Sequence, residues 1–292
     1  MDKVSIVIPV YGQWHLLKRN IDSLIKFDKD LIHEIIFVND CSPEKNPYVF
    51  DDSIVKEVLN ITNKGYAGTV NVGLKKASSD IVVLLDSDAY PIESFIRKVI
   101  DAFRKNKRLG CIGFATVDDE GSPVGNFRYE PNVYGLMLGQ KLEAKLSFLN
   151  GKKGNLLPYS CAVAFRKKCL EDMEYLDEIN FPVLDADHDI SMRIHRSNWI
   201  LKYDSDITVS HKGGNSYQIN YKRVLLFYNS RWRLLKKHNK LGVSSIVKKV
   251  ILSRLYFEWV LLKGLLMVKP NNEMYKEKME GRKIIINSVS FN

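Results

Sequence analysis

The sequence predicts an α/β fold: a doubly wound, mainly parallel sheet with flanking helices, followed by a C-terminal helical extension. In the first half, short β-branched runs alternate with segments whose apolar residues recur at helical spacing. Such alternation favours parallel strands joined by helical crossovers. After residue 220 the chain turns basic and aromatic, and Leu225, Tyr228, Trp232 and Leu235 fall at helical spacing. This change predicts the helical extension.

Each predicted element is a run with one periodicity. The expected strands cover residues 4–10, 34–38, 54–59, 81–85, 109–117, 160–165, 199–203 and 207–209. The expected helices cover residues 14–25, 91–105 and 187–196, and residues 65–77 are expected to be a loop that enters a helix. Pro91 is expected at the first helical position, which suits proline because its missing N–H is not needed there. Residues 118–154, which have weak periodicity, are expected to form an irregular excursion over the active face.

Length and composition limit the function classes. The chain has 292 residues, enough for one large α/β domain with an appendage or for two small domains, and its 45% hydrophobic content excludes a disordered chain. A formal net charge of +10 favours an anionic partner such as a nucleotide, a nucleic acid or an acidic lipid surface. The four cysteines lack zinc-like spacing, so we expect free thiols in a reducing compartment. We expect neither a signal peptide nor a membrane span.

The strongest chemical signal is Asp86-Ser87-Asp88, directly after the buried run at 81–85. The carboxyl ends of parallel strands form the ligand-binding edge of such a sheet. Two neighbouring carboxylates suit Mn²⁺ or Mg²⁺, which also bind diphosphate oxygens. The alternative is a polar turn in which Asp88 caps the following helix.

Three weaker signals lie elsewhere. The acidic run from Asp185 to Asp189 either caps a helix, with Asp189 pairing with Arg193, or supplies a general base. His211, at the end of a strand, is either a metal ligand or an ordinary turn histidine. A glycine-containing loop before a helix either lets backbone N–H groups approach phosphate or sugar, or is a plain turn. The candidate donor contacts in and after this loop are Asn63, Gly65, Gly68 and Asn71.

The order of these segments resembles glycosyltransferase family 2, whose members have a GT-A-type fold. The segments that carry the resemblance are VSIVIPVYG at 4–12, FVNDCS at 37–42, NKGYAGTVNVGL at 63–74, LLDSDAYP at 84–91, CAVAFRK at 161–167, DADHDISMRIHRSNW at 185–199 and VSHKGG at 209–214. The resemblance as a whole covers about three quarters of the chain, to roughly residue 240, and the shared order of the segments is more specific than any one of them.

The resemblance implies an inverting transfer of a sugar from a nucleotide diphosphate, with a UDP-sugar as the first expectation, to an acceptor hydroxyl. It implies that Asp88, His211 and Asp86 bind Mn²⁺ or Mg²⁺ and that Asp187 is the catalytic base. It also implies that the nucleotide sugar contacts Pro9, Val10, Tyr11, Asn39, Asp40, Asp86 and Ser87. The chain departs from the family pattern at Ala186, where glutamate is usual, at Asn39, where aspartate is common, and at Thr69-Val70, which replaces a frequent Ala-Arg pair.

We therefore expect a catalytic domain at 1–220, with a nucleotide-binding half at 1–117 and an acceptor and catalytic half at 118–220, and a helical tail at 221–292. The expected acceptor is a growing surface polysaccharide or lipid-linked glycan, in the cytoplasm or at the inner face of the cytoplasmic membrane. The tail either covers the catalytic domain or binds an anionic membrane surface through 246–268. Two rival functions stay open, a metal-dependent nucleotidyltransferase and a basic nucleic-acid-binding module, although no nucleic-acid motif is present.

Overall fold

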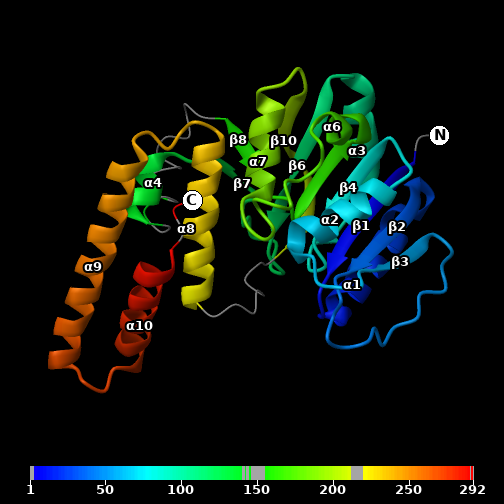
Figure 1. The fold of residues 1–292 in the computed structure, drawn as a ribbon. Coiled ribbons are helices and arrows are strands. Elements are labelled where there is room, and N and C mark those ends of the chain that lie inside the picture. Colours follow the sequence, from blue (N-terminus) through cyan, green and yellow to red (C-terminus); the bar gives the residue numbers. More distant parts are fainter. Residues whose placement is uncertain are drawn as a thin grey trace. The chain divides into compact units, whose positions relative to one another are not determined.

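The chain forms two compact units. The computed structural model describes residues 3–139, 142, 145, 155–211, 220–289 and 291 (Figure 1). The first unit takes in residues 1–128 and 155–214, and the second takes in residues 129–154 and 215–292. The predicted glycine pair at 213–214 and most of 140–154 lie outside the described residues.

The first unit is built on an eight-stranded sheet, counted over the described residues, in the order β3-β2-β1-β4-β9-β6-β10-β5. Its strands are β1 (Val4–Val10), β2 (Ile32–Asn39), β3 (Val55–Leu59), β4 (Ile81–Leu85), β5 (Tyr90–Pro91), β6 (Leu109–Val117), β9 (Ala162–Arg166) and β10 (Ile200–Ser210). β1 pairs in parallel with both β2 and β4, whereas β9 runs antiparallel between β4 and β6. The sheet is therefore mixed and mostly parallel, as predicted.

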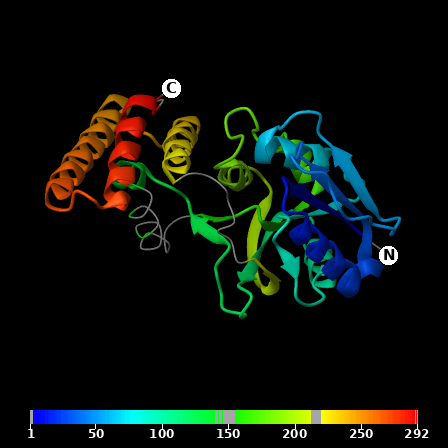
Figure 2. The same cartoon turned by 90° about the horizontal axis from the view of Figure 1, so that it is seen from below.

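Helices cover both faces of this sheet (Figure 2). They are α1 (Trp14–Asp28), η1 (Lys29–Leu31), α2 (Gly65–Lys76), α3 (Ile96–Lys105), α6 (Lys167–Asp172) and α7 (Ala186–His195). Alternate β1 residues such as Ile6 and Ile8 join one core cluster with α1 and α3. Val7 points to the other face, where α2 approaches so closely that a Cβ on Gly73 would overlap the Val7 side chain. The alternation along β1 thus separates the two helical layers.

Two predicted boundaries are wrong. Pro91 does not begin a helix: it lies in β5, paired with Val209 of β10, and α3 begins at Ile96. The N-terminus of α3 is instead capped by Asp28 at the end of α1, whose Oδ2 accepts a hydrogen bond from the Phe95 N–H at 3.0 Å. The strands expected at 199–203 and 207–209 are one strand, β10, with a register shift between Asp204 and Thr208.

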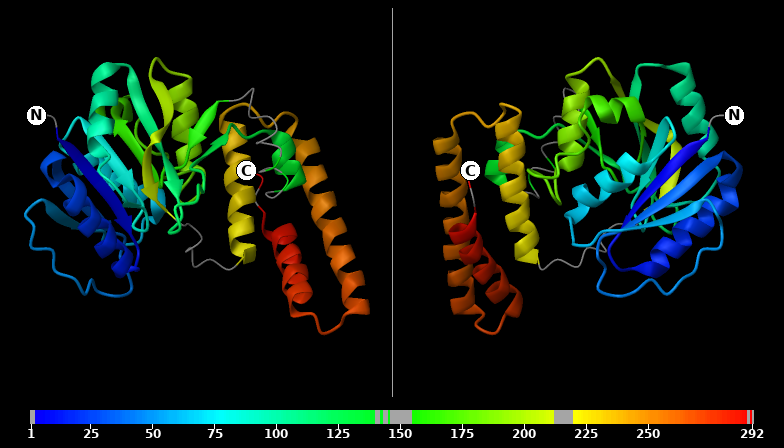
Figure 3. Two further views of the ribbon diagram at one scale, coloured as in Figure 1. Left: turned by 180° about the vertical axis from the view of Figure 1, so that it is seen from behind. Right: turned by 45° about the vertical axis from the view of Figure 1, so that its right-hand side comes forward.

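The second unit is helical, which confirms the predicted C-terminal extension. Its helices among the described residues are α4 (Val133–Leu138), α8 (Asn220–Lys237), α9 (Ser244–Val268) and α10 (Glu273–Ser288), and α9 and α10 form a hairpin (Figure 3). Arg282 of α10 donates to Glu258 of α9 at 2.5 Å, and Arg254 of α9 donates to the Tyr228 hydroxyl of α8. A separate pair of short strands, β7 (Phe127–Tyr129) and β8 (Leu156–Pro158), completes the described elements. In the described part of the chain, every helix is too short or too polar to cross a membrane.

Candidate active site

The candidate site lies where β1, β2 and β4 end. These strands are parallel neighbours, so the segments after Val10, Asn39 and Leu85 leave the sheet at one edge. The fold therefore brings three candidate segments together that are far apart in the sequence.

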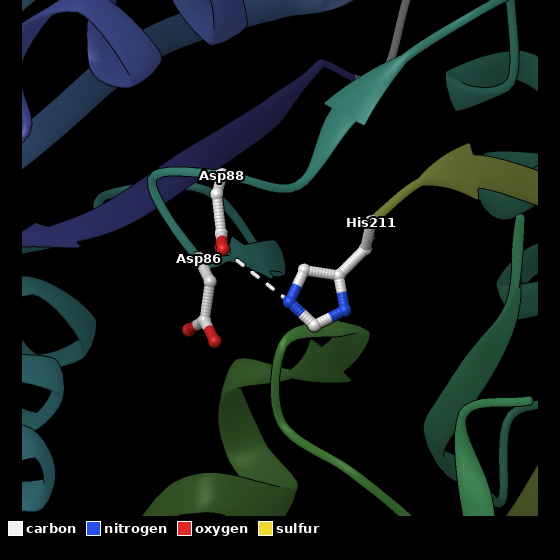
Figure 4. Close-up of side chains that lie close together, drawn as sticks. All are labelled: Asp86, Asp88 and His211. Carbon is white, nitrogen blue, oxygen red and sulfur yellow. Dashed lines mark ion pairs between the residues drawn. The ribbon is translucent and has the colours of Figure 1, made fainter. Parts of the chain in front are cut away.

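Asp86, Asp88 and His211 meet at this edge (Figure 4). One ligand atom from each residue lies within 4.8 Å of the others, and His211 Nε2 is 3.4 Å from Asp88 Oδ1. Both aspartates follow β4, whereas His211 follows β10, where its N–H donates to the Val117 carbonyl at 2.8 Å. Parallel pairing of β10 with β6 carries the histidine to the carboxylates.

Burial and the local charges together shift the pKa values of Asp86 and His211. Burial, together with the charges of Asp88 and Asp187, raises the pKa of Asp86 to about 6, although His211 acts in the opposite direction. Burial would lower the pKa of His211, but its hydrogen bond with Asp88 and the two carboxylate charges raise it above its ordinary value. Two carboxylates and one imidazole this close form a donor set that suits Mn²⁺ or Mg²⁺, because a divalent cation would relieve the repulsion between the carboxylates.

Asp86 is held in place by groups that the sequence did not single out. The Tyr66 hydroxyl donates to Asp86 Oδ1 at 2.9 Å and also lies 2.8 Å from Ser160 Oγ. The Asn20 side chain donates to the Asp86 carbonyl at 3.0 Å, and the Asp86 N–H donates to the Cys161 carbonyl at 2.9 Å. No sequence signal beyond position was available for these contacts: Tyr66 follows Gly65 at the start of α2, and Ser160 and Cys161 precede β9. Ser87, between the two aspartates, is half-buried.

Asp40 organises the loop before α2. Its Oδ1 accepts hydrogen bonds from Asn60 Nδ2 at 2.9 Å and from the Lys64 N–H at 2.8 Å, and its carbonyl accepts one from Asn63 Nδ2 at 3.3 Å. The preceding residue, Asn39, accepts a hydrogen bond from the Ser42 N–H at 3.0 Å. The structure therefore brings Asn39, Asp40 and Asn63 together, with Asn60 as a buried partner that the sequence did not indicate.

The predicted donor contacts at the end of β1, which are Pro9, Val10 and Tyr11, lie beside this loop. The side chains of Pro9 and Val10 are buried at the end of β1, and the Val10 carbonyl accepts a hydrogen bond from the Asp40 N–H at 2.9 Å. Tyr11 is the exposed member, with 56% of its surface accessible. Of these three residues, Tyr11 has the side chain that can meet a ligand.

The other predicted donor contacts, Gly65, Gly68 and Asn71, lie in α2 and make close contacts within the protein. Gly65 has a φ of +72°, and a Cβ there would lie 2.9 Å from the Pro182 carbonyl oxygen, so glycine is required. A Cβ on Gly68 would lie 2.9 Å from the Lys64 Cβ. The Asn71 amide donates to the Leu176 carbonyl at 2.8 Å and accepts from the Leu176 N–H at 3.0 Å. These two hydrogen bonds connect Asn71 of α2 to Leu176, in the segment before α7.

The acidic run around α7 divides between buried and partly exposed carboxylates. Asp189 is fully buried, and its Oδ2 accepts a hydrogen bond from Arg193 Nε at 2.8 Å, the i,i+4 pair expected from the sequence. Asp185 lies 2.9 Å from His188 Nδ1 and makes no side-chain cap. Asp187, 16% exposed, accepts from the His188 N–H at 2.8 Å, and its charge acts on both Asp86 and Cys161. Of these three acids, Asp187 is the one that combines exposure with closeness to the aspartate pair.

Comparison with protein families and curated proteins gives consistent matches. The model of "Glycosyl transferase family 2" matches residues 5–173. A dolichol-phosphate mannosyltransferase of Pyrococcus furiosus is 28% identical over 189 residues, which are 62% of this chain and 51% of that protein. A poly-beta-1,6-N-acetyl-D-glucosamine synthase of Staphylococcus epidermidis is 23% identical over 212 residues, 70% of this chain and 48% of that protein. The chain spans about half the length of these relatives.

Solved structures share the fold. The mannosyltransferase PcManGT from Pyrobaculum calidifontis, in complex with GDP-Man and Mn²⁺, superposes with a TM-score of 0.56 at 13% identity, covering 97% of this chain and 85% of that one. S. aureus TarS 1-349 in complex with UDP gives a TM-score of 0.53 at 18% identity, covering 86% of this chain and 70% of that one. Both likenesses support the GT-A-type fold expected for the first unit.

Proposed function

Because the chain belongs to glycosyl transferase family 2, we propose that it transfers a sugar from a nucleotide diphosphate sugar to an acceptor hydroxyl, with inversion at the anomeric carbon. The family match covers more than half of the chain and confirms the resemblance stated from the sequence. The observation that carries the proposal is the meeting of Asp86, Asp88 and His211 at one sheet edge, with the charge of Asp187 acting on Asp86.

In this proposal, Asp88, His211 and Asp86 hold Mn²⁺ or Mg²⁺. The bound ion would offset the negative charge of the diphosphate leaving group. The closeness of the three donor groups supports this assignment, and so does the raised pKa of Asp86, to which the neighbouring carboxylate charges contribute.

Asp187 acts as the general base. Its carboxylate takes the proton of the acceptor hydroxyl while the acceptor oxygen forms a bond to the anomeric carbon and the bond from that carbon to the diphosphate breaks. A single displacement of this kind inverts the anomeric configuration and needs no covalent sugar–enzyme intermediate. Asp187 is preferred over Asp189 because the carboxylate of Asp189 is fully buried against Arg193.

The donor pocket is proposed along the segments after β1, β2 and β4. Tyr11, Asn39 and Asp40 would face the base and ribose, and Asp86 with Ser87 would lie beside the ribose and diphosphate. Pro9, Val10, Asn63, Gly65, Gly68 and Asn71 would shape this pocket through their backbone and packing. The bonds that join Asp40 to Asn63 and to the Lys64 N–H support a preformed pocket.

A UDP-sugar is the proposed donor, and a growing surface polysaccharide or lipid-linked glycan is the proposed acceptor. A matched relative in Escherichia coli is named as a UDP-Glc:alpha-D-GlcNAc-diphosphoundecaprenol beta-1,3-glucosyltransferase, 31% identical over 127 residues, 42% of this chain and 50% of that protein. A lipid-linked acceptor of this class supports a location of the protein in the cytoplasm or at the inner face of the cytoplasmic membrane.

A screen of nucleotide sugars tests the proposal. Each UDP-sugar and GDP-mannose is incubated with the protein, with Mn²⁺ or with a chelator, and the release of nucleoside diphosphate is measured. We expect slow release from one UDP-sugar that stops with chelator, and a loss of Mn²⁺ binding in Asp88→Asn measured by calorimetry. Production of pyrophosphate would favour a nucleotidyltransferase instead, and equal nucleotide affinity with and without metal would remove the metal from the proposal.

A further inference from the structure

The second unit carries the excess positive charge of the chain. Residues 129–154 and 215–292 contain 20 Lys and Arg against 6 Glu, a net charge of +14, whereas the first unit contains 24 Lys and Arg against 28 Asp and Glu. The formal charge of +10 therefore does not come from the unit that holds the candidate active site. A surface of the second unit that binds a partner would attract an anionic one.

Helix α9 of this unit has two apolar faces. One face packs inside the unit through Val247, Ile251 and Leu255, which are spaced by four residues and buried. The other face is exposed over the whole helix, and at 100° per residue its members fall within an arc of about a quarter turn. Its exposed apolar residues are Ile246, Val250, Phe257, Val260, Leu261 and Val268. We call this set the α9 stripe.

The α9 stripe is long and uncovered in the described part of the chain. The 25 residues of α9 extend over about 37 Å at the helical rise. Phe257 is 61% exposed, Leu261 50% and Val268 78%. An apolar surface of this length in contact with water is unfavourable, which marks it as an interaction surface.

One flank of the stripe combines aromatic rings with lysines. Tyr256 and Trp259 lie with their ring centroids 5.7 Å apart, and Lys263 Nζ lies 5.5 Å from the Trp259 ring centroid. Lys249, about two helical turns before Tyr256, falls on the same flank. Aromatic rings and lysines beside an apolar face suit the boundary between lipid headgroups and acyl chains, where the rings and the lysine stems bury apolar atoms and the charges stay in water.

We propose that the α9 stripe lies on an anionic lipid surface, with its apolar side chains inserted at the headgroup boundary and Lys249 and Lys263 against the headgroups. Charge selects this occupant over a second copy of the chain, because pairing two stripes would bring two units of net charge +14 together. The helix lies in the plane of the surface rather than across it, since no described helix is long and apolar enough to span a membrane. This inference does not depend on the proposed reaction, because it concerns a different unit.

Vesicle sedimentation with the full chain tests the proposal. We expect binding to vesicles that contain phosphatidylglycerol, weaker binding to phosphatidylcholine alone, and a decrease with added salt. The double variant Phe257→Ser and Leu261→Ser leaves the charge unchanged and should lower the partition coefficient by about tenfold or more. The matched control Ile179→Ser removes an exposed apolar side chain of the first unit and should bind like the unmodified protein.

A second pair of substitutions separates charge from apolar contact. Lys249→Gln with Lys263→Gln should reduce the salt dependence while keeping the apolar contribution. Circular dichroism establishes that each variant is folded, and nucleoside diphosphate release without vesicles reports the proposed reaction separately. Equal binding by the stripe variant, or no binding of the full chain at low salt, would overturn the proposal. A dimer that dissociates in the stripe variant, without vesicle binding, would assign the stripe to a second copy.

Discussion

At the scale of single residues, the acids around α7 differ in what surrounds them. The Asp189 carboxylate is fully buried and bonded to Arg193, which also donates to the Tyr175 carbonyl at 2.8 Å. The Asp187 carboxylate is partly exposed and close enough for its charge to raise the pKa of Asp86. Their environments therefore predict different defects for the same substitution.

Asp187→Asn should keep donor binding and lower sugar transfer by roughly a hundredfold or more, because a missing general base slows proton removal by about that factor. Calorimetry gives the binding, and initial rates with donor and acceptor give the transfer. Asp189→Asn, the control, should lower the free energy of unfolding instead, because Arg193 would lose its charged partner. Near-normal transfer by a folded Asp187→Asn variant would move the base to Asp185 or Asp189.

Some site residues that follow strands could be predicted from the sequence, whereas the residues that hydrogen-bond to them could not. The aspartate pair could be predicted because it follows a buried run at a strand end. From the residues alone His211 stayed open, and its place beside Asp86 and Asp88 was expected only from the family resemblance. Tyr66, which donates to Asp86, and Ser160, which contacts Tyr66, could not be predicted, because their contact joins segments 94 residues apart and has no local pattern. Asn60, buried between Asp40 and Thr69, was missed for the same reason.

At the scale of elements, capping explains the wrong boundary at Pro91. Local rules favoured a helix from Pro91, but Asp28 of α1 supplies the cap for α3 from 67 residues away. Ser94 Oγ donates to the other oxygen, Asp28 Oδ1, at 2.6 Å. A tertiary contact of this kind overrides a local preference and cannot be read from residues 86–105 alone.

Asp28→Ala should therefore lower the free energy of unfolding by about 1–2 kcal/mol, the usual value for a lost helix cap. Urea denaturation followed by circular dichroism measures it. Asp30→Ala, an exposed neighbouring acid, should change the stability by no more than about 0.5 kcal/mol. If both variants lose the same amount, the cap contributes nothing of its own.

The start of β2 carries a buried carboxylate with a pH-dependent contribution. Burial alone would raise the pKa of Glu34, but hydrogen bonds from Ser78, Lys56 and Ser5 outweigh burial and lower the pKa from 4.5 to about 2. Because the pKa of Glu34 is lower in the folded state than in the unfolded state, its ionised carboxylate stabilises the fold at pH values above the unfolded-state pKa. This contribution is lost as the pH falls from about 4.5 to about 2.

Glu34→Gln should then destabilise the protein by up to about 3 kcal/mol at neutral pH, and the difference from the unmodified protein should shrink as the pH falls towards about 2. Denaturant unfolding at a series of pH values measures this difference. A constant difference over the whole pH range would show that Glu34 acts through packing or neutral hydrogen bonds instead of its charge.

At the scale of the whole molecule, the two units differ in charge, composition and predictability. Most buried strands of the first unit could be predicted from the sequence because they are short apolar runs between helices. The helical character of the second unit followed from spacing. Its inclusion of residues 129–154 did not, because α4, the described helix in that range, meets α8 and α9 only through tertiary packing.

Two compact units should unfold in two steps, and ligand should stabilise only the first unit. A nucleoside diphosphate with Mn²⁺, at about a hundredfold excess over its dissociation constant, should stabilise the unit that binds it by about 2.7 kcal/mol. Differential scanning calorimetry should then show one transition that moves to higher temperature with ligand and one that stays. The variant Asp88→Asn should show the same two transitions without the ligand-dependent movement. A single transition that moves as a whole would mean that the units unfold cooperatively. Deletion of residues 221–292 identifies the transition of the helical unit, and if only that transition moved with ligand, nucleotide binding would belong to the helical unit.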